Sequence, residues 1–181
     1  MKNLLLLTGF TCNNNCLICS VSEMKKYYQD RSYDEIVYDL KEARKMGFED
    51  VEFTGGEPSI RQDFLKLVFD TRRMGFKTIA VSTNGRMFSY ESFCEKVLKA
   101  GLNRVTFSLL GSKALIHNSL TRTPNSFAHI VKGIKNIKKY QTLHPRCGTN
   151  FIMIVFILSI FFFSFIPVKT FIYRLGMRLL L

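Results

Sequence analysis

The chain has 181 residues, a 47% share of hydrophobic residues and a formal net charge of +12 at pH 7. Its length suits one domain with its own core, and its apolar content excludes an intrinsically disordered chain. All fourteen acidic residues lie at or before Glu95, so the first 95 residues, with thirteen basic residues, carry a net −1 and the remainder +13. Such a basic half could bind an anionic membrane surface, an anionic substrate or nucleic acid, of which nucleic acid is the least favoured.

Three of the five cysteines, Cys12, Cys16 and Cys19, fall within eight residues near the N-terminus. Cysteines this close are poorly suited to join distant segments, and an odd total leaves one thiol over, so a disulfide framework is not expected and a reducing compartment fits better. The apolar run at residues 4–8 is too short for a secretory signal. We therefore expect a cytoplasmic domain whose first strand lies at this run.

Strand-like and helix-like segments alternate along the first 140 residues or so. The expected strands are residues 4–8, 51–54, 78–82 and 105–109, and the expected helices are residues 33–46, 60–74, 90–100 and 124–137. Ser32 and Glu35 have the spacing of a capping box, and Gly47, Gly75 and Gly101 stand where helices commonly end. Alternation of this kind predicts right-handed βαβ units and a parallel sheet.

The chain changes character after about residue 146. No charged residue occurs between Cys147 and Val168, and residues 151–168 are apolar apart from two serines and a proline. This length fits a membrane-spanning helix, and the cations on both sides fit such an anchor. A frameshift-derived or truncated segment explains the same stretch equally well. We expect two regions, residues 1–148 and an apolar tail at 149–181.

The cysteine spacing C-x3-C-x2-C favours a soft metal centre. Thiolates suit iron–sulfur clusters, zinc and Cu(I), and a short loop lets several thiolates converge. Three thiolates leave one iron of a four-iron cubane with an open position, where a cofactor can bind. The alternative is a zinc site that borrows a fourth ligand such as Cys94, Cys147 or a histidine.

This spacing, directly after a first strand, resembles the cluster motif of the radical S-adenosylmethionine (radical SAM) superfamily. The sequence TGGEP at residues 54–58 follows the second expected strand and resembles the family's Gly-Gly-Glu-Pro motif. The resemblance implies that Cys12, Cys16 and Cys19 ligate a 4Fe-4S cluster. It also implies that the motif's Gly55, Gly56, Glu57 and Pro58 hold the methionine end of S-adenosylmethionine.

Two weaker matches to motifs of the family follow, at the ends of the third and fourth expected strands. Ser82 and Asn84 belong to an STNG segment that resembles the family's motif near the ribose and carboxylate of the cofactor, and Ser108 resembles a small polar position after the fourth strand. Ile18 stands where the family often has an aromatic residue on the adenine. Residues 117–127 resemble the branch of molybdenum-cofactor, haem-maturation and peptide-modifying enzymes. All the strand-end positions lie where parallel α/β sheets place their active sites.

The resemblance implies an α/β fold, a partial (βα) TIM-like barrel with a parallel sheet of about four to five strands and outer helices. To this we add a C-terminal apolar helix. The implied function is binding of the cluster and reductive cleavage of S-adenosylmethionine to a 5′-deoxyadenosyl radical, which abstracts hydrogen from an unknown substrate. A one-electron donor of the flavodoxin or ferredoxin type is implied. Because the family usually has six βα units and only four are evident, a catalytically inactive iron–sulfur fragment and a zinc-binding basic protein are kept as alternatives.

Overall fold

The computed structural model describes residues 3–141 of the chain, in which strands and helices alternate. The elements are β1 (Asn3–Leu7), α1 (Tyr33–Lys45), β2 (Asp50–Thr54), α2 (Phe64–Arg73), β3 (Thr78–Thr83), α3 (Glu91–Ala100), β4 (Arg104–Phe107), α4 (Ala114–Thr121) and α5 (Ser126–Gln141), with short 3-10 turns η1 (Met24–Lys26), η2 (Pro58–Ile60) and η3 (Met87–Ser89). The capping box expected at the start of α1 is confirmed, because Ser32 Oγ accepts from Glu35 N and the Glu35 carboxylate accepts from Ser32 N.

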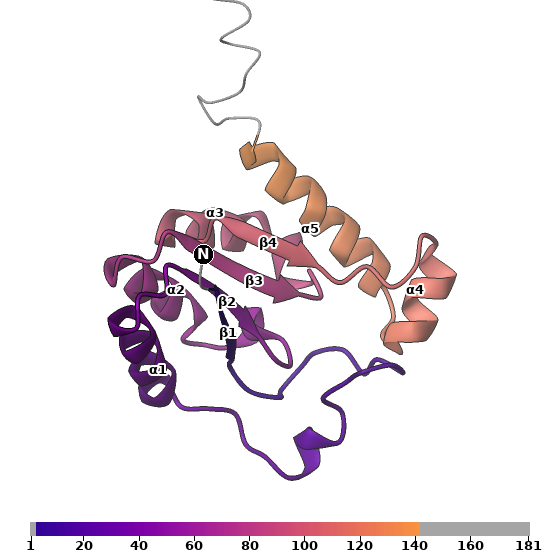
Figure 1. Cartoon of the computed structure of the whole chain (residues 1–181). Coiled ribbons are helices and arrows are strands. Elements are labelled where there is room, and N and C mark those ends of the chain that lie inside the picture. Colours follow the sequence, from indigo (N-terminus) through magenta and orange to yellow (C-terminus); the bar gives the residue numbers. More distant parts are fainter. Residues whose placement is uncertain (1–2, 142–181) are drawn as a thin grey trace, which may run out of the picture. The chain divides into compact units, whose positions relative to one another are not determined.

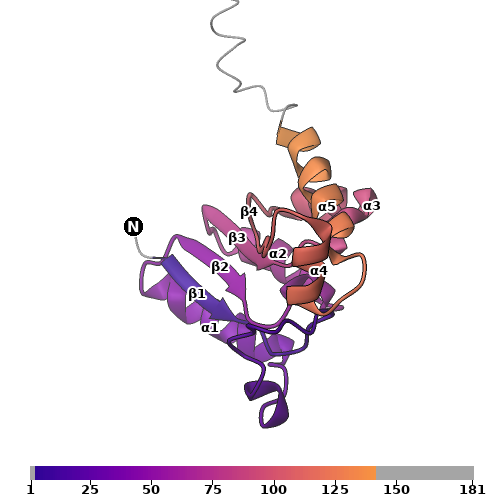
Figure 2. The same cartoon turned by 90° about the vertical axis from the view of Figure 1, so that its right-hand side faces the viewer.

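The four strands form one parallel sheet in the order β1-β2-β3-β4 (Figures 1 and 2). The register pairs Leu6 with Phe53, Phe53 with Val81 and Val81 with Val105. Each strand therefore lies beside the next one in the sequence, and the intervening helices return along one face of the sheet. This singly wound order is that of a partial barrel, so the α/β fold with outer helices is confirmed.

The two faces of the sheet differ in character. Val51, Phe53, Ile79 and Val81 share one face and are fully buried, and the Phe53 ring meets Phe64 of α2 edge to face at 5.9 Å. Residues on the opposite face include Leu5, which is 66% exposed, and Glu52, which is partly buried. The core therefore lies between the sheet and the helices. The inner face of the partial barrel stays open among the described residues.

Helix α5 approaches the turn after β3 very closely. A Cβ atom on Gly133 would lie 2.7 Å from the Gly85 carbonyl oxygen and 3.0 Å from Phe88 Cβ. Three residues further along, Asn136 Nδ2 donates to the carbonyl oxygens of Phe88 and Ser89 at 2.9 and 3.1 Å. The missing side chain at position 133 thus lets α5 pack against the backbone that leads from β3 to α3.

Three helices differ from the sequence expectation. In the segment expected as one helix over residues 60–74, α2 begins only at Phe64, after the 3-10 turn η2 has ended at Ile60. Residues 114–121, for which no helix was expected, form α4, and the last helix begins at Ser126 rather than at residue 124. Asn118 explains this boundary, because its Oδ1 accepts from Ser126 Oγ and Phe127 N, both at 2.9 Å. The end of α4 thereby caps the start of α5.

The apolar tail at residues 149–181 lies outside the described residues, and so do its expected helix and the expected membrane segment at 151–168. Across residues 3–141, the helices are all too short or too polar to cross a bilayer. The division into residues 1–148 and 149–181 stays a prediction.

Replacing Gly133 by Ala tests the packing of α5. Alanine favours a helix over glycine by about 0.5–1 kcal/mol, but the added methyl meets the Gly85 carbonyl at 2.7 Å. We expect a net loss of about 1–2 kcal/mol in the free energy of unfolding, because overpacking outweighs the helix gain. Urea unfolding of the full chain, followed by circular dichroism, measures the change.

The matched control is Ala128→Gly at an exposed position of the same helix. It reports the helix preference alone and should lose about 0.5–1 kcal/mol. A Gly133→Ala protein more stable than the wild type would contradict the close packing of α5.

Candidate functional site

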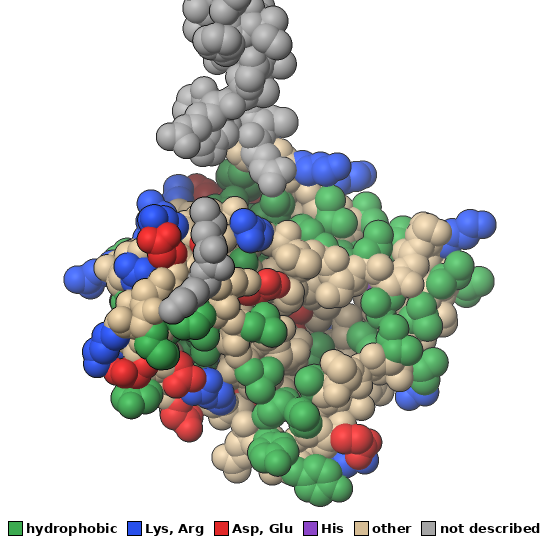
Figure 3. Space-filling view, in the orientation of Figure 1, with side chains coloured by type: hydrophobic (Ala, Val, Ile, Leu, Met, Phe, Trp, Pro, Cys, Tyr) green, Lys and Arg blue, Asp and Glu red, His purple; other side chains and the backbone are tan. Residues whose placement is uncertain are grey.

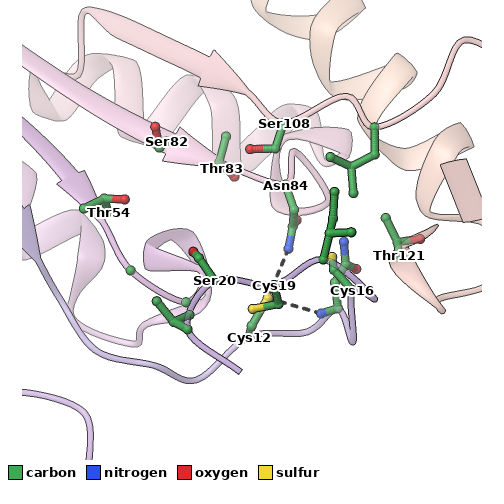
Figure 4. A pocket seen from close by; sticks show the side chains of 16 residues that line it. Cys12, Cys16, Cys19, Ser20, Thr54, Ser82, Thr83, Asn84, Ser108 and Thr121 are labelled. Carbon is green, nitrogen blue, oxygen red and sulfur yellow. Dashed lines mark hydrogen bonds between the residues drawn. The ribbon is translucent and has the colours of Figure 1, made fainter. Parts of the chain in front are cut away.

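A pocket opens where the strands of the sheet end at their carboxyl termini (Figure 4). Its walls come from the loop after β1, the turns after β2 and β3, the end of β4 and the end of α4. Nine of the eleven residues predicted for the site line it: Cys12, Cys16, Ile18, Cys19, Gly55, Gly56, Ser82, Asn84 and Ser108. The other two, Glu57 and Pro58, lie outside its lining.

The three cysteines lie on the cysteine loop, which we define as residues 8–19 between β1 and η1. Their thiols are free and partly buried. Within residues 3–141, no three histidine, cysteine or acidic side chains are arranged to hold a single metal ion. A 4Fe-4S cluster makes a different demand, because each thiolate binds a separate iron of the cube.

Asp30 holds the loop on the N-terminal side of Cys12. Its Oδ1 accepts from Phe10 N at 2.6 Å and from Thr11 N at 2.9 Å. Burial alone would raise the pKa of Asp30, but the hydrogen bonds from Thr11 and Phe10 and the nearby Arg61 guanidinium lower it overall. The carboxylate therefore anchors the chain where it leaves β1, a role that sequence reasoning missed.

The turn after β3 holds the middle of the loop. Asn84 Nδ2 donates to Asn13 Oδ1 at 2.7 Å, and Arg86 donates to the Asn13 carbonyl oxygen and, at 3.4 Å, to Asn14 Oδ1. Sequence reasoning placed Asn84 at the site but missed Arg86. The arginine directly follows the STNG segment, and that adjacency was the available signal.

The end of α4 holds the loop around Cys16. Asn15 N donates to the Thr121 carbonyl oxygen at 3.1 Å, and Leu17 N donates to the Leu120 carbonyl oxygen at 2.8 Å. The last carbonyl groups of a helix have no partner within the helix. Here the cysteine loop supplies two of those partners, so α4 fixes the backbone on both sides of Cys16.

The glycines of the TGGEP turn bring it into direct contact with the cysteine loop. Gly56 N donates to the Gly9 carbonyl oxygen at 2.9 Å, and Glu57 N donates to the Thr11 carbonyl oxygen at 2.8 Å. A Cβ atom on Gly56 would lie 2.2 Å from that same Thr11 oxygen. The close approach that requires glycine at position 56 is thus an approach of two loops of the protein.

Glu57 does not line the pocket and is only 2% exposed. Its Oε1 accepts from Ser59 N at 3.2 Å, Ser59 Oγ at 2.5 Å and Thr83 Oγ1 at 2.7 Å, and its Oε2 accepts from Asn84 N at 2.6 Å. Burial raises the pKa of Glu57, while these hydrogen bonds oppose the rise. The carboxylate therefore ties the turn after β2 to the turn after β3, with Pro58 buried beside it at the start of η2.

The remaining predicted residues lie at the rim and wall of the pocket. Ser82 Oγ donates to Glu52 Oε1 at 2.5 Å, and Ser108 N donates to the Thr83 carbonyl oxygen at 2.9 Å, which leaves the Ser108 hydroxyl at the pocket (Figure 4). Ile18 is 65% exposed although its side chain is apolar. The pocket thus combines hydroxyl groups on the strand side with an aliphatic side chain on the loop side.

Hydrophobic side chains gather over the cysteine loop, η1 and α4 on the face shown in Figure 3. They include Leu17, Tyr27, Tyr28, Leu109 and Leu115, each between 47% and 84% exposed. Exposed apolar surface of this kind is typical of binding sites.

The donor set fits a cluster with one open iron. Three thiols line the pocket, and Cys94, one candidate fourth ligand, lies in the core on α3. Its Sγ donates to the Phe88 carbonyl oxygen at 3.0 Å, and burial raises the pKa of Cys94 to about 11. Cys147, the other candidate, lies outside the described residues. Three soft ligands beside a pocket that carries both hydroxyl groups and aliphatic side chains suit an iron–sulfur cluster that also binds a cofactor.

Comparison with known proteins gives GTP 3′,8-cyclases among the curated relatives. A GTP 3′,8-cyclase of Clostridium botulinum (strain Hall) is 36% identical over 132 residues, which are 71% of this chain and 40% of that protein. A protein of Saccharolobus solfataricus described as "Probable GTP 3′,8-cyclase" is 28% identical over 136 residues, 75% of this chain and 43% of that protein. The chain spans about two fifths of the length of these curated relatives.

Solved structures share the fold. Methylornithine synthase superposes with a TM-score of 0.62 at 20% identity, over 76% of this chain and 41% of that one. SuiB of Streptococcus suis, bound to its precursor peptide SuiA, superposes with a TM-score of 0.64 at 18% identity, over 76% and 30% of the two chains.

The sequence model of the radical SAM superfamily matches residues 6–158, which include the cysteine loop, all of β2 to β4 and the pocket between them. The match covers most of the chain, and the chain therefore belongs to the radical SAM superfamily.

Proposed function

We propose that this chain binds a 4Fe-4S cluster through Cys12, Cys16 and Cys19 and binds S-adenosylmethionine in the adjoining pocket. One observation carries the proposal. The three thiols line the same pocket as the TGGEP turn and the STNG segment, although these segments lie up to 70 or so residues apart in the sequence. Membership of the superfamily supports this assignment, because the family implies both the cluster and S-adenosylmethionine.

The reduced cluster would supply one electron to the sulfonium of bound S-adenosylmethionine, whose cleavage yields methionine and a 5′-deoxyadenosyl radical. The residues of this chain would bind S-adenosylmethionine and orient it beside the cluster. Thr54, Gly55 and Gly56 line the pocket close to the cysteine loop, so their backbone suits the methionine end. Ser82 and Ser108 would contact the ribose or carboxylate, although the Ser82 hydroxyl already donates to Glu52.

Ile18 would supply the adenine contact. An aliphatic side chain that is 65% exposed gains free energy when a flat ring covers it, by about 25 cal/mol for each Å² removed from water. Glu57 would act on the methionine end indirectly, by holding the two turns together. Its carboxylate already accepts four hydrogen bonds within the protein.

Each cleavage consumes one electron, so the proposal includes a one-electron donor of the flavodoxin or ferredoxin type. The match covers less than half of each GTP 3′,8-cyclase, so the reaction in their name belongs to proteins with much additional chain. The proposal for this chain is therefore limited to the cofactor chemistry, with hydrogen abstraction from a substrate as its outcome.

Anaerobic reconstitution with iron and sulfide, followed by dithionite and S-adenosylmethionine, tests the function directly. We expect the full chain to become brown and to release 5′-deoxyadenosine, measured by chromatography. Cys16→Ala removes one iron ligand and should abolish both. Cys94→Ala is the control, because this cysteine lies in the core outside the pocket, and it should retain both. A colourless wild-type protein that holds zinc would refute the proposal.

Gly56→Ala tests the contact between the TGGEP turn and the cysteine loop. The new methyl would lie 2.2 Å from the Thr11 carbonyl oxygen and must displace the backbone next to Cys12. We expect the bound iron to fall below half of the wild-type value of about four atoms per chain. Iron analysis after reconstitution measures the effect.

Gly47→Ala is the control for Gly56→Ala, because a Cβ atom at Gly47 has no neighbour within 4 Å. Its positive φ makes alanine cost about 1–2 kcal/mol of stability, but iron binding should be unchanged. Equal iron loss in both variants would show that general destabilisation, and not the loop contact, is responsible.

A further inference from the structure

Cys12 differs from the other two cysteines in its hydrogen bonds. Two N–H groups point at its sulfur, the backbone N of Asn14 at 3.4 Å and the side-chain Nδ2 of Asn84 at 3.7 Å (Figure 4). Within residues 3–141, no side-chain donor bonds to the sulfur of Cys16 or Cys19. The surroundings of the three thiols are therefore unequal, and the side chain of Asn84, in the turn after β3, contributes to the difference.

The orientation of the Asn84 amide is determined by its neighbours. Its Oδ1 accepts from Arg86 N at 3.0 Å, so the oxygen faces the turn and the NH₂ group faces the cysteine loop. One N–H bonds to Asn13 Oδ1 at 2.7 Å, and the other is directed at Cys12 Sγ. The backbone N of Asn84 also donates to buried Glu57 at 2.6 Å, which fixes the position of the residue.

We propose that Asn84 is a positioning residue that raises the reduction potential of the cluster through its N–H···S bond to Cys12. The inference rests on the proposed function, since it requires the cluster. Reduction adds an electron whose negative charge is shared by the sulfur atoms, and an N–H dipole directed at one of them stabilises the reduced form more than the oxidised form. The amide lies at the end of β3, so the sheet itself holds this donor in place.

The same geometry limits what Asn84 can offer to S-adenosylmethionine. Both N–H groups are used by the cysteine loop, and Oδ1 has one remaining lone pair. Asn84 can therefore accept a hydrogen bond from the cofactor but cannot donate one without releasing Cys12 or Asn13. Its effect on the cluster is separate from its place in the pocket wall.

The test is the midpoint potential of the reconstituted cluster in the full chain, without S-adenosylmethionine, from a mediated titration followed by electron paramagnetic resonance. Asn84→Leu keeps the branched shape and removes both donors. At a fixed potential we expect about a tenfold lower ratio of reduced to oxidised cluster, the order expected for one hydrogen bond to a charged group. For a one-electron couple this is a shift of about 59 mV to more negative potential.

Asn13→Ala is the matched control. It removes the 2.7 Å partner of Asn84 Nδ2 but leaves the N–H···S bond and the Arg86 contact to the backbone of Asn13. Its potential should equal that of the wild type. An unchanged potential in Asn84→Leu, or an equal shift in Asn13→Ala, overturns the inference.

Asn84→Asp provides a second variant if Asn84→Leu binds no iron. It keeps the acceptor for Arg86 N, lacks the donors and should also shift the potential to more negative values. If both variants lack a cluster that the wild type holds, the role of Asn84 is structural and the inference is wrong while the proposed function stands. If the wild type itself takes up no cluster, the proposed function fails, and the inference fails with it.

Discussion

The cysteine loop has almost no regular secondary structure, so its shape depends on hydrogen bonds from other elements. Asp30 holds its start, the turn after β3 holds its middle, and the end of α4 holds its backbone around Cys16. Fixing a loop residue costs about 1–2 kcal/mol of conformational entropy. The contacts from three directions offset this cost before any cofactor binds, which favours cofactor binding because less ordering remains to be done.

Glu57 connects this arrangement to the core. A buried carboxylate without partners would cost several kcal/mol, and the four donors around Glu57 offset that cost. Two of those donors come from Thr83 and Asn84 at the end of β3, so satisfying the carboxyl oxygens brings the turns after β2 and β3 together. Asn84 then extends the connection to Cys12. One buried carboxyl group thus helps to fix the distance between the sheet and the cysteine loop.

The singly wound sheet explains why the pocket is open. Its helices cover one face only, and β4 is an edge strand among the described residues. The inner face and the apolar side chains over η1 and α4 are exposed there. The matched segment is about two fifths of the length of the curated relatives, which therefore contain further chain beyond the part matched. The pocket is thus assembled at the carboxyl ends of four strands.

The sequence by itself determined the features that depend on neighbouring residues. Periodicity and the Ser32–Glu35 capping box predicted α1, and the positions of the cysteines, Gly55 and Asn84 after successive strands predicted which segments meet. Only the tertiary structure decided that Glu57 is buried against the turn after β3, that Arg86 and Asp30 hold the loop, and that α4 exists and caps α5 through Asn118. The reason is physical, because these features depend on hydrogen bonds between distant segments. Many of those bonds involve backbone groups, which every residue has, so no local sequence pattern predicts them.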